Sequence, residues 1–271
     1  MQLTSLNDIT TQHRHIFLSP HFDDVVYSCG GTLGVQISSG IRPLVITVFG
    51  GVPATNLTPS AFAIQANRGM GLDLSKGMHL AVEQRRKEDA AALDYIGADY
   101  LWLDYQDAVY RGNPPYYTSE AQLIGGDIHH DDLWIDQELS QTLISLAERL
   151  PDAAWYAPLG VGRHVDHQIV CSAADRLIQR NVKVYLYEEF PYVAQKGALA
   201  ARQHELGLTL EPALVEMSEM LPLRLEASAI YASRTTADFG SKEAMFQTMT
   251  DYSHSLRPVE TIHLERYWQV R

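Results

Sequence analysis

Short apolar runs alternate with longer segments of helical composition along the first 190 residues of the chain. The apolar runs have the length of buried strands, and two of the longer segments end on natural helix stops, Gly40 and Gly97. Strands that alternate with helices form a parallel sheet with helices on both faces. The pattern therefore predicts an α/β fold with a Rossmann-like, mostly parallel sheet, in a single domain over residues 1–271.

The predicted strands are 15–20, 44–49, 99–105, 152–160 and 182–190. The predicted helices are 23–40, 80–97, 133–150 and 165–181. After residue 190 we expect mostly helical or irregular structure. Two further segments, 52–78 and 106–132, are too long for ordinary connections between elements. We expect these long loops to fold over the rim of the sheet as walls or a lid.

Polar clusters follow four of the predicted strands at the point where each strand ends. In chain order they are 21–24, then Asp104 with Asp107, then 164–167, and finally Glu188 with Glu189. In open parallel sheets, ligands bind beyond the carboxyl ends of the strands. The four clusters are therefore expected to share one functional site at that rim.

Two of these clusters contain ligands for a metal ion. The segment "SPHFDDVV" carries His21 and Asp24, three residues apart at the start of a predicted helix, and "GVGRHVDHQ" carries His167. A hydrolytic zinc site needs three nitrogen or oxygen ligands and one open position for water. His21, Asp24 and His167 satisfy this requirement if the sheet brings the two loops together.

The same clusters also supply groups for proton transfer. Asp23 is adjacent to a ligand but directed elsewhere, so it can act as general base. His164 can stabilise an oxyanion or protonate a leaving amine, and Asp166 can orient a histidine. The structural alternative is that an aspartate at a helix start is only a cap and that histidines in a loop are solvated.

The combination of "PHFDD", "GG" six residues later and "HVDH" resembles the LmbE/PIG-L family of zinc-dependent N-deacetylases. The resemblance implies zinc on the three ligands above, with Fe²⁺ as the alternative ion, Asp23 as base, and His164 as acid or oxyanion partner. It extends to "RRKEDAAALDYIG", "YEEFPY" and "YASR", and covers about residues 15–235. Val25 and Phe22 depart from the commonest family pattern without removing a ligand, which leaves the substrate identity open.

Several rim residues are candidates for binding substrate. The family resemblance suggests that Arg85 or Arg86 grips substrate, whereas the structural alternative pairs Arg85 with a carboxylate on its own helix. The remaining candidates lie at the start of the second long loop or after the fifth strand: Asp107, Tyr110, Arg111, Glu188, Glu189 and Tyr192.

Charge and composition exclude several other classes of function. The net charge is −12, and the one basic cluster, in "EQRRKED", is balanced by its own acidic residues, so nucleic acid is not an expected partner. No apolar run approaches the ~20 residues needed to span a bilayer, and no signal peptide is predicted. The two cysteines fit buried thiols in a cytoplasmic protein. Gly30 and Gly31 come too late after their strand to cradle a phosphate, and we interpret them as close packing of helix against sheet.

These observations predict a cytoplasmic, zinc-dependent hydrolase that removes an N-acetyl group from an N-acetylglucosamine-type sugar or small glycoconjugate. One alternative is an amidase acting on another acyl or thiol conjugate, and the other is an inactive module that binds sugar or metal. The sequence leaves the oligomeric state open, a homo-oligomer included. The segment "DIHHDD", residues 127–132, is interpreted as a solvated helix cap outside the site.

Overall fold

The computed structural model describes residues 1–55, 57–259 and 261–271. A seven-stranded sheet forms its centre, in the order β3-β2-β1-β4-β5-β7-β6. Strands β1 to β5 are mutually parallel, while β7 pairs antiparallel with both β5 and β6. The strands are β1 (His15–Ser19), β2 (Pro43–Thr47), β3 (Asp99–Trp102), β4 (Ala154–Pro158), β5 (Val184–Tyr187), β6 (Leu210–Glu216) and β7 (Leu264–Val270).

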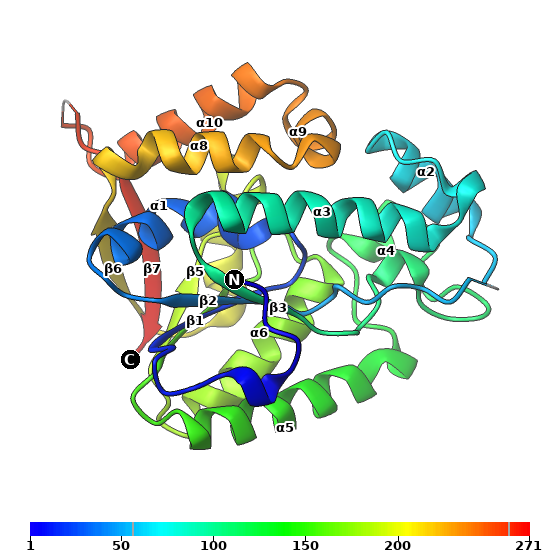
Figure 1. Cartoon of the computed structure of the whole chain (residues 1–271), viewed down its shortest axis with the longest axis horizontal. Helices are drawn as coiled ribbons and strands as arrows, with labels where there is room; N and C mark the ends of the chain where they lie inside the picture. Colours follow the sequence, from blue (N-terminus) through cyan, green and yellow to red (C-terminus); the bar gives the residue numbers. More distant parts are fainter. Residues whose placement is uncertain (56, 260) are drawn as a thin grey trace.

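Helices cover the sheet on both sides (Figure 1). Helices α5 and α6 lie below the sheet in this view, and α1, α3 and α8 lie above it. The α-helices are α1 (Asp24–Ser38), α2 (Ala61–Gly69), α3 (Met78–Ile96), α4 (Glu120–Leu123), α5 (Leu133–Arg149), α6 (Val165–Ile178), α7 (Ala198–Leu206), α8 (Leu221–Ala229), α9 (Ala232–Phe239) and α10 (Lys242–Ser255). Among the described residues, no helix has both the length and the apolar character needed to cross a bilayer.

Six short 3₁₀ helices complete the described structure. They are η1 (Leu6–Asp8), η2 (Leu74–Lys76), η3 (Ala108–Tyr110), η4 (His130–Asp132), η5 (Tyr192–Ala194) and η6 (Ser218–Met220). The long segment 52–78 contains α2 and η2, and the segment 106–132 contains η3, α4 and η4. We predicted from their length that these two segments form walls or a lid over the rim of the sheet.

The predicted α/β class and the five parallel strands are confirmed. The two helix stops also lie where expected: Gly97 ends α3 in a left-handed conformation at φ 92°, and Gly40, at φ 76°, follows the end of α1. The region after residue 190 is mostly helical or irregular, as expected, but it also contains β6 and β7, which were not predicted and which extend the sheet. Strand β6 contains Pro212 and lies at the sheet edge, where a missing backbone donor is tolerated.

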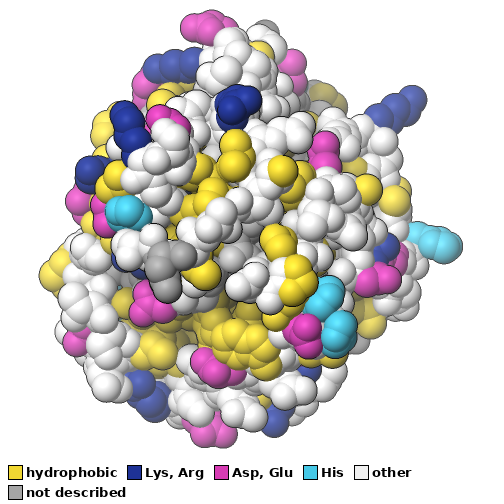
Figure 2. Space-filling model, turned by 90° about the vertical axis from the view of Figure 1, so that its right-hand side faces the viewer, with side chains coloured by type: hydrophobic (Ala, Val, Ile, Leu, Met, Phe, Trp, Pro, Cys, Tyr) yellow, Lys and Arg dark blue, Asp and Glu magenta, His cyan; other side chains and the backbone are white. Residues whose placement is uncertain are grey.

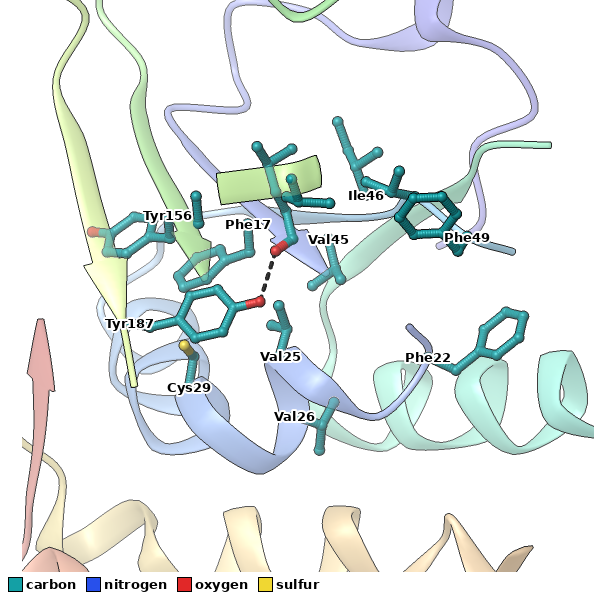
Figure 3. Packing of buried hydrophobic residues seen from close by; sticks show 14 of the residues in the cluster. Phe17, Phe22, Val25, Val26, Cys29, Val45, Ile46, Phe49, Tyr156 and Tyr187 are labelled. Atoms are coloured by element: carbon teal, nitrogen blue, oxygen red, sulfur yellow. Dashed lines mark hydrogen bonds between the residues drawn. The ribbon is translucent and has the colours of Figure 1, made fainter. Parts of the chain in front are cut away.

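The core packs between the first strands and α1 (Figure 3). Phe17 on β1 stacks on Tyr156 of the adjacent β4 with ring centroids 4.1 Å apart. The hydroxyl of Tyr187 on β5 donates to the carbonyl oxygen of Leu18 across 2.8 Å, so this buried polar group is satisfied. The packing fixes β1 and β4 side by side, and the loops that follow these two strands therefore begin close together.

The glycine pair of α1 packs against both a helix and the sheet. A Cβ atom at Gly30 would lie 3.0 Å from Arg224 Cγ of α8, and one at Gly31 would lie 2.7 Å from Met217 Cγ and 2.8 Å from Glu265 Oε1 of β7. The interpretation as close packing of helix against sheet therefore holds for Gly31, and α8 is an additional partner at Gly30. A phosphate-binding turn would require these backbone groups to face open space instead.

Candidate active site

The two motif loops meet because β1 and β4 are adjacent and parallel. The loop after β1 carries His21 and enters α1 at Asp24, and the loop after β4 carries His164 and enters α6. All the side chains of both motifs that were predicted to act in the site are buried at 8% exposure or less. The sheet thus brings together residues that are more than 140 positions apart in the chain, as the His21–Asp166 contact shows.

The spacing of three of these side chains fits a single metal ion. Asp24 Oδ2 lies 3.4 Å from His21 Nδ1 and 3.3 Å from His167 Nε2. Tetrahedral ligands with bonds of about 2.0–2.2 Å lie roughly 3.3–3.6 Å from one another. The potential ligand atoms of His21, His164 and His167 also lie within 4.8 Å of one another. The nitrogen and oxygen donors are therefore suitable for zinc or another borderline divalent ion.

A buried carboxylate orients each of the two histidines that face Asp24. Asp166 Oδ2 lies 2.9 Å from His21 Nε2, and Glu189 Oε1 lies 3.3 Å from His167 Nδ1. These contacts leave His21 Nδ1 and His167 Nε2 directed at Asp24. Such partners fix the tautomer and angle of a metal-binding ring. The orienting role expected of Asp166 is thus compatible with the structure, and it is exerted on the histidine of the other loop.

The surrounding carboxylates strongly favour protonated histidines when no metal is bound. Burial lowers the pKa of His21, but Asp107, Asp166 and Asp24 outweigh it and raise the pKa to about 10. Burial likewise opposes protonation of His167, whose pKa is raised to about 9 by Asp24 and Glu189. Both side chains therefore carry a proton at neutral pH in the metal-free protein, and metal binding must release these protons.

Asp23 is free for chemistry because it does not cap its helix. It occupies the N-cap position of α1, yet its side chain makes no capping hydrogen bond. Arg85 Nη2 donates to Asp23 Oδ1 across 3.0 Å, and Arg234 Nε lies 3.6 Å from Asp23 Oδ2. The structure therefore does not support the alternative that the Asp23 side chain only caps the helix. The two arginines hold the carboxylate on the wall of the cavity beside the metal ligands.

His164 is held as a neutral hydrogen-bond donor. It does cap α6, since its Nδ1 accepts from the backbone N–H of Asp166 at 3.2 Å. Burial lowers the pKa of His164 well below its ordinary value, and the nearby charge of His21 lowers it further. A neutral imidazole that accepts at Nδ1 carries its proton on Nε2. This arrangement favours the oxyanion role over the acid role for His164.

A cavity of about 50 Å³ lies in front of these groups. Of the predicted substrate contacts, the structure places Arg85, Asp107 and Tyr192 on its wall. One residue from each long segment, Met70 and Asp107, reaches the wall. The cavity is large enough to hold water molecules beside the candidate ligands.

The structure directs the other four predicted contact residues elsewhere. Arg111 pairs with Asp132 and Asp166, and Tyr110 donates to Asn67, so neither side chain lines the cavity. Glu189 is fully buried and accepts from Gly160 and His167.

Glu188 turns to the opposite side of β5 from Glu189. Its carboxylate binds the side chains of Tyr252, Arg266 and Trp268. For Tyr110, Arg111, Glu188 and Glu189 the structure thus replaces the expected substrate contact with an internal hydrogen bond. The two glutamates directly follow β5, and their side chains bind different partners, so they do not share one pocket.

Arg234 is a cavity residue that the sequence analysis did not select. It lies on α9, and its guanidinium binds Asp238 through two hydrogen bonds of 2.6 and 3.0 Å. Its Nη1 atom faces the weakly accepting sulfur of Met70 at 3.4 Å. The only sequence signal was its place in "YASR", because no spacing rule connects α9 to the strand ends.

The family model "PIG-L: GlcNAc-PI de-N-acetylase" matches residues 16–178. This range contains both motif loops and the intervening strands. The chain belongs to the PIG-L family. Membership confirms the resemblance inferred from "PHFDD" and "HVDH" and identifies the chain as a hydrolytic N-deacetylase.

Relatives within the family agree with this assignment. A 2'-N-acetylparomamine deacetylase of Niallia circulans is 36% identical over 189 residues, which cover 66% of this chain and 68% of the relative. A 2'-N-acetylparomamine deacetylase of Streptomyces fradiae is 28% identical over 238 residues, covering 85% and 77%. The zinc-inhibited form of teicoplanin deacetylase Orf2 superposes with a TM-score of 0.77 at 26% identity, covering 94% of this chain and 97% of that one.

Replacing Glu189 by glutamine is expected to lower metal affinity about 10–100-fold, because His167 loses the charged partner that orients it. Competition with a chromophoric chelator measures the affinity. Glu188→Gln is the matched control, since that carboxylate binds Arg266 and Trp268 instead. Equal losses of affinity in the two variants would contradict the orienting role of Glu189.

Proposed function

We propose that this PIG-L family member is a zinc-dependent deacetylase of an N-acetylated amino sugar. The observation that carries the proposal is the convergence of His21, Asp24 and His167 beside an uncapped Asp23. A site that only bound a metal or a sugar would have no need for this free carboxylate. Zinc is favoured as the ion because two imidazoles and one carboxylate suit it.

A zinc ion held by His21, Asp24 and His167 would supply Lewis acidity and a water of lowered pKa. Asp23 then takes a proton from the water as the oxygen attacks the acetamide carbonyl carbon. His164 donates its Nε2 proton in a hydrogen bond to the carbonyl oxygen, where negative charge develops. When the C–N bond breaks, Asp23 returns its proton to the leaving amine. The products are acetate and a free amino sugar.

The arginines beside Asp23 have a positioning role in this scheme. Arg85 Nη2 holds one carboxylate oxygen, Oδ1, at 3.0 Å, while Arg234 lies beside the other oxygen without a hydrogen bond. Oδ2 is therefore the oxygen that we assign to proton transfer. Arg85 also lies 3.4 Å from Asp107 Oδ2, so it connects the base to a carboxylate on the cavity wall.

For the substrate we propose an amino sugar that carries additional cationic groups. The net charge of −12 favours a cation over an anion at long range. Asp107 places a carboxylate on the cavity wall. The names of the two curated relatives, both 2'-N-acetylparomamine deacetylases, point to the same class.

We expect the zinc-loaded protein to release acetate faster from 2'-N-acetylparomamine than from free N-acetylglucosamine. N-acetylcysteine, which represents the thiol-conjugate alternative, should give no acetate. A coupled acetate assay on all three compounds measures this order. Preference for the thiol compound would favour the amidase alternative. A protein with stoichiometric zinc and no turnover on any sugar would favour the inactive binding module.

A further inference from the structure

A second group of metal-ligand side chains lies on a surface turn at the end of the segment 106–132. The potential ligand atoms of His129, His130 and Asp131 all lie within 4.8 Å of one another. Asp131 Oδ1 lies 3.3 Å from His130 Nε2. His129 Nδ1 accepts from the backbone N–H of Asp131 at 3.2 Å, so Nε2 is the ring nitrogen of His129 that is left for a metal ion. None of the three lines the catalytic cavity. Figure 2 shows histidine and acidic side chains adjacent to one another on one end of the molecule.

Neighbouring aromatic residues hold this turn in place. The ring of Tyr116 stacks on His129 with centroids 4.3 Å apart and planes 5° from parallel. The backbone N–H of His129 donates to the hydroxyl of Tyr117 at 2.9 Å. Because His129 is already fixed, a bound ion would need to order only the more exposed side chains of His130 and Asp131, which are 79% and 52% exposed. Such preorganisation lowers the entropic cost of binding.

The next residue, Asp132, adds a negative charge that is only partly compensated. Its carboxylate is 1% exposed, and Oδ2 accepts from Arg111 at 2.9 Å and from Tyr117 at 2.8 Å. Its other oxygen, Oδ1, is buried without a hydrogen-bond partner among the residues that the structure describes. A buried unpaired acceptor is unfavourable. Asp132 directly follows the three candidate ligands, so this unpaired acceptor adjoins the turn in the sequence.

We propose that His129, His130 and Asp131 form a second zinc site, separate from the catalytic one and weaker than it. Two imidazoles and a carboxylate are a zinc ligand set, and the 3.3 Å between His130 Nε2 and Asp131 Oδ1 is close to the roughly 3.4 Å of tetrahedral ligands. Magnesium and calcium are disfavoured because they prefer oxygen ligands. The site is weaker because His130 and Asp131 are solvent-exposed and because, among the residues that the structure describes, no buried carboxylate contacts His130. The segment also lies where the sequence analysis placed it, at an exposed helix cap outside the catalytic cavity.

The test counts zinc per chain by mass spectrometry after dialysis against buffered free zinc at increasing concentration. Wild type should bind one ion tightly and a second ion at higher free zinc. His130→Gln/Asp131→Asn should bind one ion, and both changes are on the surface, so the fold is retained. His204→Gln, which removes an exposed histidine of α7, is the matched control and should bind two.

A variant lacking a catalytic ligand separates the two sites. His167→Ala should lose the tight ion and keep the weak one, and adding His130→Gln/Asp131→Asn should abolish both. Identical binding curves for wild type and His130→Gln/Asp131→Asn would overturn the proposal. The contact between His130 and Asp131 would then be an ordinary surface ion pair. Because metal is counted directly, this result does not depend on whether the protein deacetylates any sugar.

Discussion

Asp23→Asn is expected to bind zinc stoichiometrically and to turn over substrate about 10²–10⁴-fold more slowly than wild type, the usual cost of losing a general base. Asparagine keeps the shape of the side chain and can still accept from Arg85 Nη2, so the cavity wall is preserved. It cannot take the proton of the attacking water. The measurement is kcat for acetate release, combined with metal analysis of the same sample.

Two neighbouring histidines provide the controls for Asp23. His164→Ala should also retain zinc and lose rate, since His164 faces the substrate oxygen in our scheme. His167→Ala should lose zinc, because its Nε2 atom is one of the three ligand atoms that converge. Near-normal turnover of zinc-loaded Asp23→Asn would show that another group activates the water. Loss of zinc from Asp23→Asn would show instead that Asp23 itself is a ligand.

The convergence of His21, Asp24 and His167 could be predicted from the sequence because the candidate site is built from strand ends. A buried strand followed at once by His21 and Asp24, and another followed by His167, places these residues on one rim whenever the strands are parallel. The sheet order then makes β1 and β4 neighbours. Local pattern and one topological rule were sufficient for this part of the site.

The partners of these residues could not be predicted in the same way. Whether Glu188 or Glu189 faces the site depends on the register of β5, and β7, which supplies the donors that bind Glu188, was not predicted at all. Arg234 reaches Asp23 because α9, which is more than 200 residues further along the chain, packs beside the start of α1. Such contacts depend on tertiary packing, which no local periodicity encodes.

Arg111 lies near the rim of the sheet, but its side chain binds two buried carboxylates. It was predicted to contact substrate, but its guanidinium is 6% exposed and donates to Asp132 at 2.9 Å and to Asp166 at 2.6 Å. Burial alone would raise the pKa of Asp166, yet Arg111 and His21 hold it well below its ordinary value. The charge on Asp166 that orients His21 is therefore maintained by Arg111.

Arg111→Met should consequently lower the free energy of unfolding by about 3–5 kcal/mol, because it leaves buried carboxylates without their cation. For a chain of this size that corresponds to a melting temperature lower by roughly 10 °C. Lys242→Met removes an ion pair with Glu226 whose side chains are 46% and 50% exposed, and it should cost less than about 1 kcal/mol. Thermal unfolding of the metal-free proteins measures both effects.

A second substitution separates the loss of charge compensation from the loss of packing around Arg111. The Arg111 guanidinium also lies over the rings of Phe49 and Tyr117, at 5.0 and 5.5 Å, and methionine retains part of that contact. Arg111→Met/Asp132→Asn should recover part of the lost stability, since one fewer buried carboxylate is left unpaired. If Arg111 served substrate instead, Arg111→Met would melt at the wild-type temperature and raise only KM, and that result would refute the role assigned to it here.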